Sequence, residues 1–294
     1  MTTLTQTGFD FTDRPPLRIA SPKLERAIDL TAYDVILINT SAGKDSQSMM
    51  DALVVEATRQ GVKDRLVAVH ADLGRVEWQG TLELAQKQAD HYGVRLIVCK
   101  RTQNDLLGHI RAKHAANLAK GKVQPPMPSP TIRDCTSDHK RGPIRTVMTA
   151  LVRELGLSGR KTRKARILNC IGIRGQEGDK RSKMAPFSVS PVGDASTQTT
   201  REVTDWYPIF NWSVEDVWAT IKASGCPHHP AYDLGMPRLS CVFCIFSQRP
   251  ELLIAGRHNP ELLADYVELE RETGYTFQTG GVALADIQAE LASE

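Results

Sequence analysis

Six consecutive residues near the start of the chain have the types and spacing of a phosphate-binding loop. They follow the apolar run Val35–Ile38 and precede a stretch with apolar residues at helical spacing, so we predict a strand, a short turn and a helix. A turn of small residues leaves backbone N–H groups uncovered, and the helix that follows adds its own unpaired N–H groups and positive dipole end. Such a turn suits an anion, above all the phosphates of a nucleotide. The six residues are Ser41, Ala42, Gly43, Lys44, Asp45 and Ser46.

This loop differs from two widespread phosphate motifs. Gly43 and Lys44 are followed by Asp45 rather than by Ser or Thr, and no glycine precedes them at the spacing of a Walker A loop. The dinucleotide pattern Gly-x-Gly-x-x-Gly is also absent from this stretch. Taken alone, the hexapeptide is also compatible with an ordinary strand-to-helix turn.

A second candidate functional motif is the pair Cys241-x-x-Cys244. Two thiolates at this spacing can point to one centre, so metal binding, cluster binding and redox exchange are the candidates. The sequence holds no second Cys-x-x-Cys pair, which argues against a zinc ribbon. The structural alternative is that both cysteines are small buried residues.

The elements that must position these residues alternate between strands and helices. This alternation predicts an α/β fold with a doubly wound, mostly parallel sheet covered on both faces. Right-handed crossovers place the loops after the strands at one edge, so Ser41–Ser46, His70–Gly74 and Gly172–Gly175 should meet there. We predict strands at 35–38, 65–70, 94–99 and 167–173, and helices at 22–31, 77–92, 105–119 and 140–155, with a further helix beginning after Ser213.

Composition sets the limits of this interpretation. The chain has 294 residues, of which 41% are hydrophobic and 24% charged, and this is enough for one core or a core with a smaller lobe. We expect an arm with a short helix (1–33), a nucleotide-binding α/β domain (34–210) and a helical C-terminal region with the Cys-x-x-Cys loop (211–294). The net charge of +3 does not by itself indicate a nucleic-acid partner. Without a secretory core or a membrane-length apolar run, we expect a cytoplasmic protein with no membrane partner.

The hexapeptide resembles the PP-loop, Ser-Gly-Gly-x-Asp-Ser, of the ATP pyrophosphatases. Ala42 replaces the first glycine, and alanine is small enough to keep the loop if its φ stays negative. Over residues 34–247 the chain resembles the phosphoadenosine phosphosulfate (PAPS) reductase group of this superfamily. The resemblance implies an adenine nucleotide alpha hydrolase-like fold that binds ATP with Mg²⁺ at Ser41–Ser46.

The same resemblance assigns roles to residues at the other strand ends. Asp72 would lie beside the nucleotide, and Gly172 begins a segment that matches the family pattern Gly-x-Arg-x-x-Glu-x-x-x-Arg. In that pattern Arg174 and Arg181 would face phosphate or another anion, and Glu177 would hold one of them in place. The alternative is a set of surface charges at helical spacing.

The resemblance also bears on the cysteines. Iron–sulfur members of the superfamily carry cysteine at the positions of Cys135, Cys241 and Cys244, which implies a 4Fe–4S cluster. Thr136 stands where adenosine-phosphosulfate-type reductases have a second adjacent cysteine, so the fourth ligand is open. Cys226 is one candidate, and a three-cysteine cluster with one open iron, as in some tRNA-thiolating relatives, is the other.

A PAPS reductase attacks sulfur with a catalytic thiol near its C-terminus, and no cysteine follows Cys244. We therefore expect closer similarity to the ATP pyrophosphatase component of bacterial DNA phosphorothioation systems. ATP would adenylylate an acceptor oxygen with loss of pyrophosphate, and sulfur would then displace AMP. Lys44 would stabilise the developing charge, and Asp45 would order the loop or the metal. The implied partners are a cysteine desulfurase or other sulfur donor and other subunits of the modification system.

Two other functions stay open at this point. One is reduction or handling of a sulfonucleotide, with the thiol supplied by a partner, and the other is a nucleotide- or cluster-sensing subunit without activity. The basic run Arg160–Arg166 bears on the acceptor, because it could contact a nucleic-acid backbone or form a solvated connector.

Overall fold

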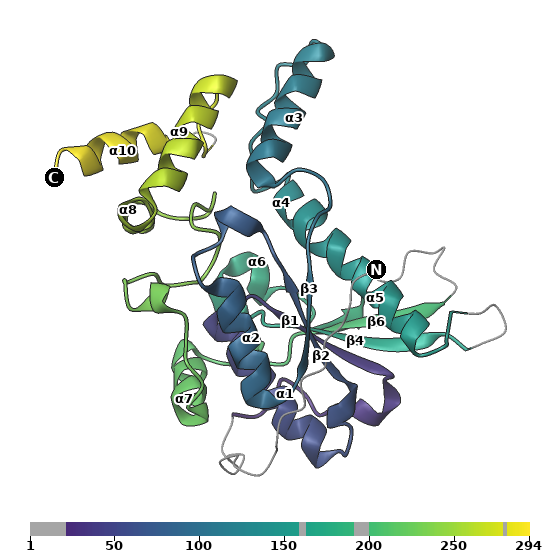
Figure 1. The fold of residues 1–294 in the computed structure, drawn as a ribbon. Helices are drawn as coiled ribbons and strands as arrows, with labels where there is room; N and C mark the ends of the chain where they lie inside the picture. Colours follow the sequence, from purple (N-terminus) through teal and green to yellow (C-terminus); the bar gives the residue numbers. More distant parts are fainter. Residues whose placement is uncertain (1–21, 159–162, 191–199, 279–280) are drawn as a thin grey trace.

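A single sheet organises the chain (Figure 1), and its order is β3-β2-β1-β4-β6-β5. The computed structural model describes residues 22–158, 163–190, 200–278 and 281–294. All neighbouring strands are parallel except β5, which runs antiparallel to β6. The predicted doubly wound, mostly parallel α/β sheet is therefore confirmed. The strands are β1 (Val35–Thr40), β2 (Leu66–Ala71), β3 (Arg95–Cys99), β4 (Ala165–Ile171), β5 (Phe187–Val189) and β6 (Arg201–Trp206).

Helices follow most of the strands. The α-helices are α1 (Lys44–Arg59), α2 (Thr81–Tyr92), α3 (Leu106–Ala119), α4 (Asp134–Thr136), α5 (Gly142–Glu154), α6 (Asp179–Ser182), α7 (Val214–Ser224), α8 (Arg249–His258), α9 (Pro260–Thr273) and α10 (Leu284–Ala292). A π-helical turn, η4 (Ser137–Arg141), joins α4 to α5. Short 3₁₀ turns are η1 (Leu30–Ala32), η2 (Lys63–Arg65), η3 (Gly74–Val76), η5 (Gly175–Glu177) and η6 (Pro230–Tyr232). Within the described ranges, no helix has the length and apolar character needed to cross a bilayer.

Two of the predicted helices differ from the structure at their start. The helix predicted for 22–31 is wrong, because only the turn η1 forms there and the Asp29 side chain accepts a hydrogen bond from the Thr31 N–H at 3.0 Å. Such a local bond competes with helix formation. The helix predicted from residue 77 begins at Thr81, because Gly80 has a left-handed φ of 84°. The predicted N-terminal arm lies outside the described residues.

Both faces of the sheet are covered, as its apolar strands require. Alternate residues of β1 face opposite sides: Ile36 and Ile38 pack with α1 and α7, whereas Val35 and Leu37 pack with α5. The predicted start of α7 after Ser213 is confirmed. Ser213 and Asp216 form reciprocal capping bonds of 3.0 and 2.9 Å. The helix then packs along α1.

The order of the strands creates a switch point between β1 and β4. After β1 the chain adds β2 and β3 on one side, and it then returns to place β4 on the other side of β1. The connections that leave β1 and β4 at their carboxyl ends therefore diverge, and ligands of doubly wound sheets bind in the crevice between them. The loop Ser41–Ser46 and the segment that begins at Gly172 lie at this point.

A second core lies beyond the sheet, where α8, α9 and α10 gather beside α3 (Figure 1). It is built from apolar residues of these helices together with Val242 and Phe243 of the Cys-x-x-Cys loop. By packing, α7 therefore belongs with the sheet, and α3 belongs with the C-terminal helices. The three sequence segments proposed as domains stay a prediction.

Glu270 of α9 should be essential to the second core. Its carboxylate is 8% exposed and accepts backbone N–H bonds from Phe277 at 2.6 Å, Leu284 at 3.0 Å and Ala285 at 3.1 Å. We expect Glu270→Ala to lower the free energy of unfolding by about 3 kcal/mol, because it leaves buried N–H groups without an acceptor. Urea denaturation measures this. Glu268→Ala, on the exposed face of the same helix, is the control and should leave the midpoint unchanged.

Candidate functional site

The phosphate-binding loop is held in shape by its own hydroxyl groups. The Ser46 hydroxyl donates to the Gly43 carbonyl at 2.9 Å and accepts the Ser41 N–H at 3.2 Å. Gly43 is the N-cap of α1 and has no side chain to cap the helix. The first N–H groups of α1 therefore lack an acceptor from the cap residue, as an anion site requires, and that of Lys44 is bonded by Tyr232 instead.

Ala42 departs from the expectation for this loop. Its φ is +56°, which makes it the one residue other than glycine with a positive φ in the described part of the chain. The condition that φ stay negative is therefore not met, and alanine occupies a conformation that glycine adopts more easily. The residue is fully buried and packs against Leu84 and Ala85, and its carbonyl accepts the Gln88 amide at 3.3 Å. These contacts hold the strained backbone in place.

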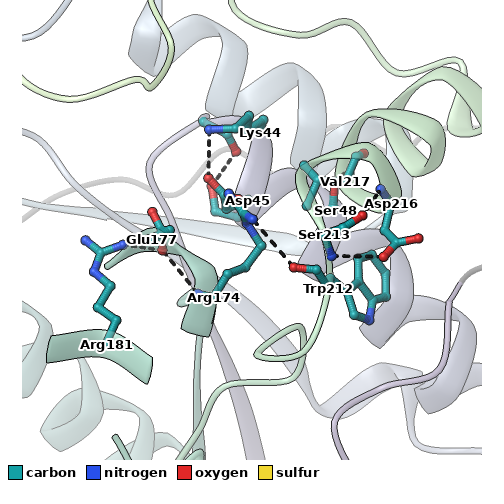
Figure 2. Close-up of polar contacts among 12 residues, drawn as sticks. Lys44, Asp45, Ser48, Arg174, Glu177, Arg181, Trp212, Ser213, Asp216 and Val217 are labelled. Atoms are coloured by element: carbon teal, nitrogen blue, oxygen red, sulfur yellow. Dashed lines mark hydrogen bonds and ion pairs between the residues drawn. The ribbon is translucent and has the colours of Figure 1, made fainter. Parts of the chain in front are cut away.

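Two cations converge on Asp45 at the start of α1. Figure 2 shows Lys44 and Arg174 reaching the carboxylate, with Lys44 Nζ 3.2 Å from Oδ2 and Arg174 Nε 2.6 Å from Oδ1. Lys44 is 4% exposed and Arg174 is 6% exposed, so both charges lie in a poorly hydrated site. One carboxylate shared by two buried cations leaves a net positive charge beside the loop, which favours an anionic ligand.

Gly172 allows β4 to approach α1 closely. A methyl group at this position would lie 3.0 Å from both the Asp45 carbonyl carbon and the Ser46 nitrogen. Because both neighbours are backbone atoms, a larger residue would push the end of β4 away from the loop. This steric constraint explains why the family pattern has glycine at this position.

Glu177 and Arg181 stand slightly apart from this group (Figure 2). The Glu177 carboxylate accepts the Arg174 backbone N–H at 3.1 Å and forms an ion pair with Arg181. Arg181 is 41% exposed, so it is held by Glu177 at the rim while Arg174 enters the site. The predicted contacts of both arginines with phosphate stay predictions.

Asp72 lies at the end of the neighbouring strand. Its carboxylate accepts the Gly74 N–H at 2.7 Å, and it lines a hollow of about 320 Å³ together with Arg75, Glu77 and Trp78. His70, two residues earlier, pairs in register with Thr40 at the end of β1. Asp72 is thus at the same edge as the phosphate-binding loop, where the topology was expected to bring it.

Tyr232 is a site residue that the sequence did not reveal. Its hydroxyl oxygen accepts the Lys44 backbone N–H at 2.8 Å and the Leu239 N–H at 3.3 Å, and Lys44 Nζ lies 5.5 Å from the centre of its ring. Burial raises the pKa of Tyr232 to about 12, so the phenol is neutral at physiological pH. The helix start at Gly43 was one hint in the sequence, because its missing side chain leaves the first N–H groups to an acceptor from elsewhere.

Two of the four predicted cysteine ligands pack against the second core, and a third, Cys244, lies in the same loop as one of them. Cys135 is in α4 and Cys241 is in the Cys-x-x-Cys loop, and beside burial the charge of Cys244 raises the pKa of both thiols, while the charge of Cys135 also raises the pKa of Cys241. Burial is the largest cause in each case, and it raises the pKa of Cys241 to about 12, while Lys140 lowers both values. Within the described ranges, no group of three His, Cys, Asp or Glu side chains is placed so that it could hold a metal ion.

Cys226 lies elsewhere. It is buried in the core between α1 and α7, where its carbonyl accepts the Gln47 amide at 3.0 Å, and burial raises the pKa of its thiol to about 11. The structure therefore does not place it with Cys135, Cys241 and Cys244.

The fold and the loop define a class of protein. A doubly wound sheet with a Ser-x-Gly-x-Asp-Ser loop at its switch point is the arrangement of the PP-loop nucleotide-handling enzymes. The family model of the phosphoadenosine phosphosulfate reductase domain matches residues 35–246, and the chain belongs to this family.

Three curated proteins are similar to this chain over part of their length. An uncharacterised protein of Methanocaldococcus jannaschii is 24% identical over 238 residues, 81% of this chain and 48% of that protein. An uncharacterised 37.8 kDa protein of Escherichia phage 186 is 32% identical over 100 residues, 34% of this chain and 28% of that protein. An adenosine 5'-phosphosulfate reductase of Neisseria meningitidis is 34% identical over 67 residues, 23% of this chain and 27% of that protein. The chain thus spans less than half the length of each.

Two solved structures show a distant likeness. A phosphoadenylyl-sulfate reductase from Candida auris, in a phosphate complex, has a TM-score of 0.45 and 16% identity over 72% of this chain and 83% of that chain. A U34-tRNA thiolase from Methanococcus maripaludis, with its 4Fe–4S cluster, has a TM-score of 0.38 and 14% identity over 89% of this chain and 72% of that chain. At these scores nothing about the chemistry of this chain follows from the likeness.

Substitutions of Ala42 test the strained loop. We expect Ala42→Gly to change the free energy of unfolding by less than about 1 kcal/mol, because relief of the positive φ offsets the lost methyl packing. Ala42→Val should cost roughly 3 kcal/mol and abolish nucleotide binding, since a β-branched residue tolerates neither the conformation nor the space. Urea denaturation and calorimetric titration with ATP measure both effects. A valine variant that binds ATP like the wild type would contradict this account of the loop.

Proposed function

We propose that the protein is an ATP pyrophosphatase that cleaves ATP between the α and β phosphates and activates an acceptor for sulfur transfer. One observation carries the proposal: a single short segment touches both the nucleotide loop and the thiols. Leu239 packs against the cluster of Ala42, Leu84 and Ala85, a methyl group at Gly43 would lie 3.3 Å from its Cβ, and Cys241 stands two residues further along the chain. A nucleotide bound at the switch point and sulfur bound at the cysteines would therefore contact neighbouring residues of one short segment.

The residues of the loop suit the binding of a triphosphate. The N-terminus of α1 would bind the β and γ phosphates, and Lys44 and Arg174 would offer positive charge to the leaving pyrophosphate. Because both oxygens of Asp45 already contact these cations, its role in this arrangement is to order them. Mg²⁺ would neutralise phosphate charge, and it is usually bound by the phosphates and one or two carboxylates, for which Asp72 is available at the same edge.

The cysteines suit a sulfur-rich group. Beside burial, the charges of Cys244 and Cys135 raise the pKa of the Cys241 thiol and Lys140 lowers it, and the buried hydroxyl of Tyr266 has no partner among the described residues. An unpartnered buried hydroxyl on a residue whose ring packs against Phe243 of the Cys-x-x-Cys loop supports a group bound near this loop. We propose that Cys135, Cys241 and Cys244 hold a 4Fe–4S cluster, which would supply or relay the sulfur.

The acceptor is proposed to be nucleic acid, with DNA phosphorothioation as the candidate modification and a cysteine desulfurase as the candidate sulfur source. The run Arg160–Arg166 supports it only in part, and its residues 160–162 lie outside the described ranges. Arg163 forms a two-bond pair with Asp34 at 2.6 and 2.7 Å, at the amino end of β4. Nucleic acid bound there would be anchored at the edge of the sheet opposite the loop.

A second candidate function is the reduction of a sulfonucleotide. It is favoured by membership of the PAPS reductase family and by the local match to adenosine 5'-phosphosulfate reductases. The two functions differ in their products. Incubation with adenosine phosphosulfates and a dithiol would release sulfite in this case, and incubation with ATP would release AMP and pyrophosphate in the other.

Loss of Asp45 should abolish the pyrophosphatase reaction. Asp45→Asn leaves Lys44 and Arg174 without their shared anion, so the charges that must meet the phosphates lose their positions. We expect at least about a 100-fold fall in the rate of AMP and pyrophosphate release. Chromatography of labelled ATP products measures this, with Asp90→Asn on the exposed face of α2 as the control. Release of inorganic phosphate alone by the wild type would refute cleavage between the α and β phosphates.

Cysteine substitutions distinguish the proposed cluster ligands from Cys226. We expect Cys135→Ser, Cys241→Ser and Cys244→Ser each to lower bound iron and sulfide severalfold, because each removes a thiolate ligand. Cys226→Ser, in the other core, should retain both. Anaerobic purification with iron and sulfide analysis and absorbance spectra gives the result. A colourless, iron-free wild type with full activity would show that the cluster is absent.

A further inference from the structure

The stretch between β3 and β4 carries positive charge that the proposed reaction has not used. Residues 106–153 include nine lysines and arginines and only two acidic residues, Asp134 and Asp138. Both acids are already paired, Asp134 with Lys113 at 2.6 Å and Asp138 with Arg101 at 3.6 Å. Most of the cations of this stretch therefore have no carboxylate nearby in the sequence, and such a stretch attracts a polyanion.

The cations lie on α3, α4 and α5 and on the segments that join them. Figure 1 shows these three helices one after another along one side of the molecule. Lys120 and Lys122 are exposed at the end of α3, Arg133 is exposed just before α4, and Arg141 is exposed at the end of η4. None of these four forms an ion pair with a carboxylate of the described residues. We call Lys120, Lys122, Arg133 and Arg141 the basic surface.

An exposed aromatic ring borders the basic surface. The Arg133 guanidinium carbon lies 5.3 Å from the centre of the Phe246 ring, and a guanidinium nitrogen donates to the Thr136 hydroxyl at 3.3 Å. Phe246 is nevertheless 42% exposed, and it is the one aromatic among the exposed large apolar residues of the described chain. An arginine ordered against an exposed ring offers a planar platform on which a nucleobase can stack.

The platform of Arg133 and Phe246 is tied to both segments that carry the thiols. Arg133 stands two residues before Cys135, and Phe246 stands two residues after Cys244. The contact between the arginine and the ring therefore joins the two segments at the border of the basic surface. A strand that follows this surface would reach the thiols at the platform.

We propose that the basic surface binds single-stranded nucleic acid, with phosphates on its lysines and arginines and one base on the platform of Arg133 and Phe246. An unpaired base can stack on a side chain, whereas a base inside a duplex presents only its edges. This inference rests on the proposed function in one respect, the choice of nucleic acid as the acceptor. It names a different surface from the run Arg160–Arg166, and it places the strand beside the cysteines rather than at the amino end of β4.

Variants of Phe246 test the platform, with a fluorescent single strand of about 12 nucleotides as the probe. We expect Phe246→Leu, which keeps an apolar side chain and loses the ring, to bind the strand about tenfold more weakly, and Phe246→Tyr to bind it like the wild type. Arg59→Gln, which removes an exposed arginine of α1, is the control and should leave the affinity unchanged. Fluorescence anisotropy at fixed salt measures the affinity, and circular dichroism checks folding. Equal affinity of the wild type and Phe246→Leu would overturn the proposal.

Replacement of both lysines at the end of α3 tests the phosphate contacts. We expect the double variant Lys120→Gln, Lys122→Gln to bind the strand more weakly. The slope of log affinity against log salt should become shallower by about 0.7 for each lysine that contacts a phosphate. DNA and RNA strands of one sequence show which backbone the surface prefers, and tight binding of either supports the proposal. An unchanged slope, or tighter binding of the duplex than of the single strand, would overturn it.

Three further outcomes separate this inference from its rivals. A greater loss in Arg163→Gln than in Phe246→Leu would move the strand to the other edge of the sheet and overturn the proposal. Polyglutamate that binds as tightly as the strand would assign the surface to an acidic protein and also overturn it. A wild type that releases AMP and pyrophosphate from ATP but binds no strand would refute this inference alone. A wild type that binds the strand through Phe246 but releases no AMP would refute the pyrophosphatase alone.

Discussion

The shared carboxylate of Asp45 is the interaction on which the candidate site depends. It joins the first turn of α1 to the segment after β4, and it balances two cations that would otherwise repel each other in a poorly hydrated place. The bond is possible only because Gly172 lets the two backbones approach closely. The two sides of the switch point between β1 and β4 are therefore joined by an ion pair as well as by the order of the strands.

The sequence was sufficient to predict what depends on short-range pattern. The apolar runs predicted the parallel strands, and Ser213 with Asp216 predicted the start of α7, because capping and strand periodicity are local. The convergence of Ser41–Ser46 and Gly172–Gly175 followed from the handedness of crossovers. In these cases the chain near a residue determines its conformation.

Interactions between distant residues were not predictable in this way. Tyr232 caps a helix whose first residue lies 188 positions earlier, and Glu270 accepts N–H groups from beyond the end of its own helix. The positive φ of Ala42 was missed for a similar reason, since the strain is held by packing against α2. Such contacts are specified by the folded arrangement of several elements rather than by any one stretch.

The Lys44 side chain also donates a hydrogen bond to the Pro237 carbonyl at 3.1 Å. Pro237 lies four residues before Cys241 on the segment that joins the loop to the thiols. A phosphate that draws Lys44 away takes this donor from the segment, so the energy of the segment differs between the free and the occupied loop. A ligand of the thiols that alters this segment would therefore change the affinity of the loop for nucleotide. By thermodynamic reciprocity, nucleotide would change the affinity of the thiols for that ligand by the same factor.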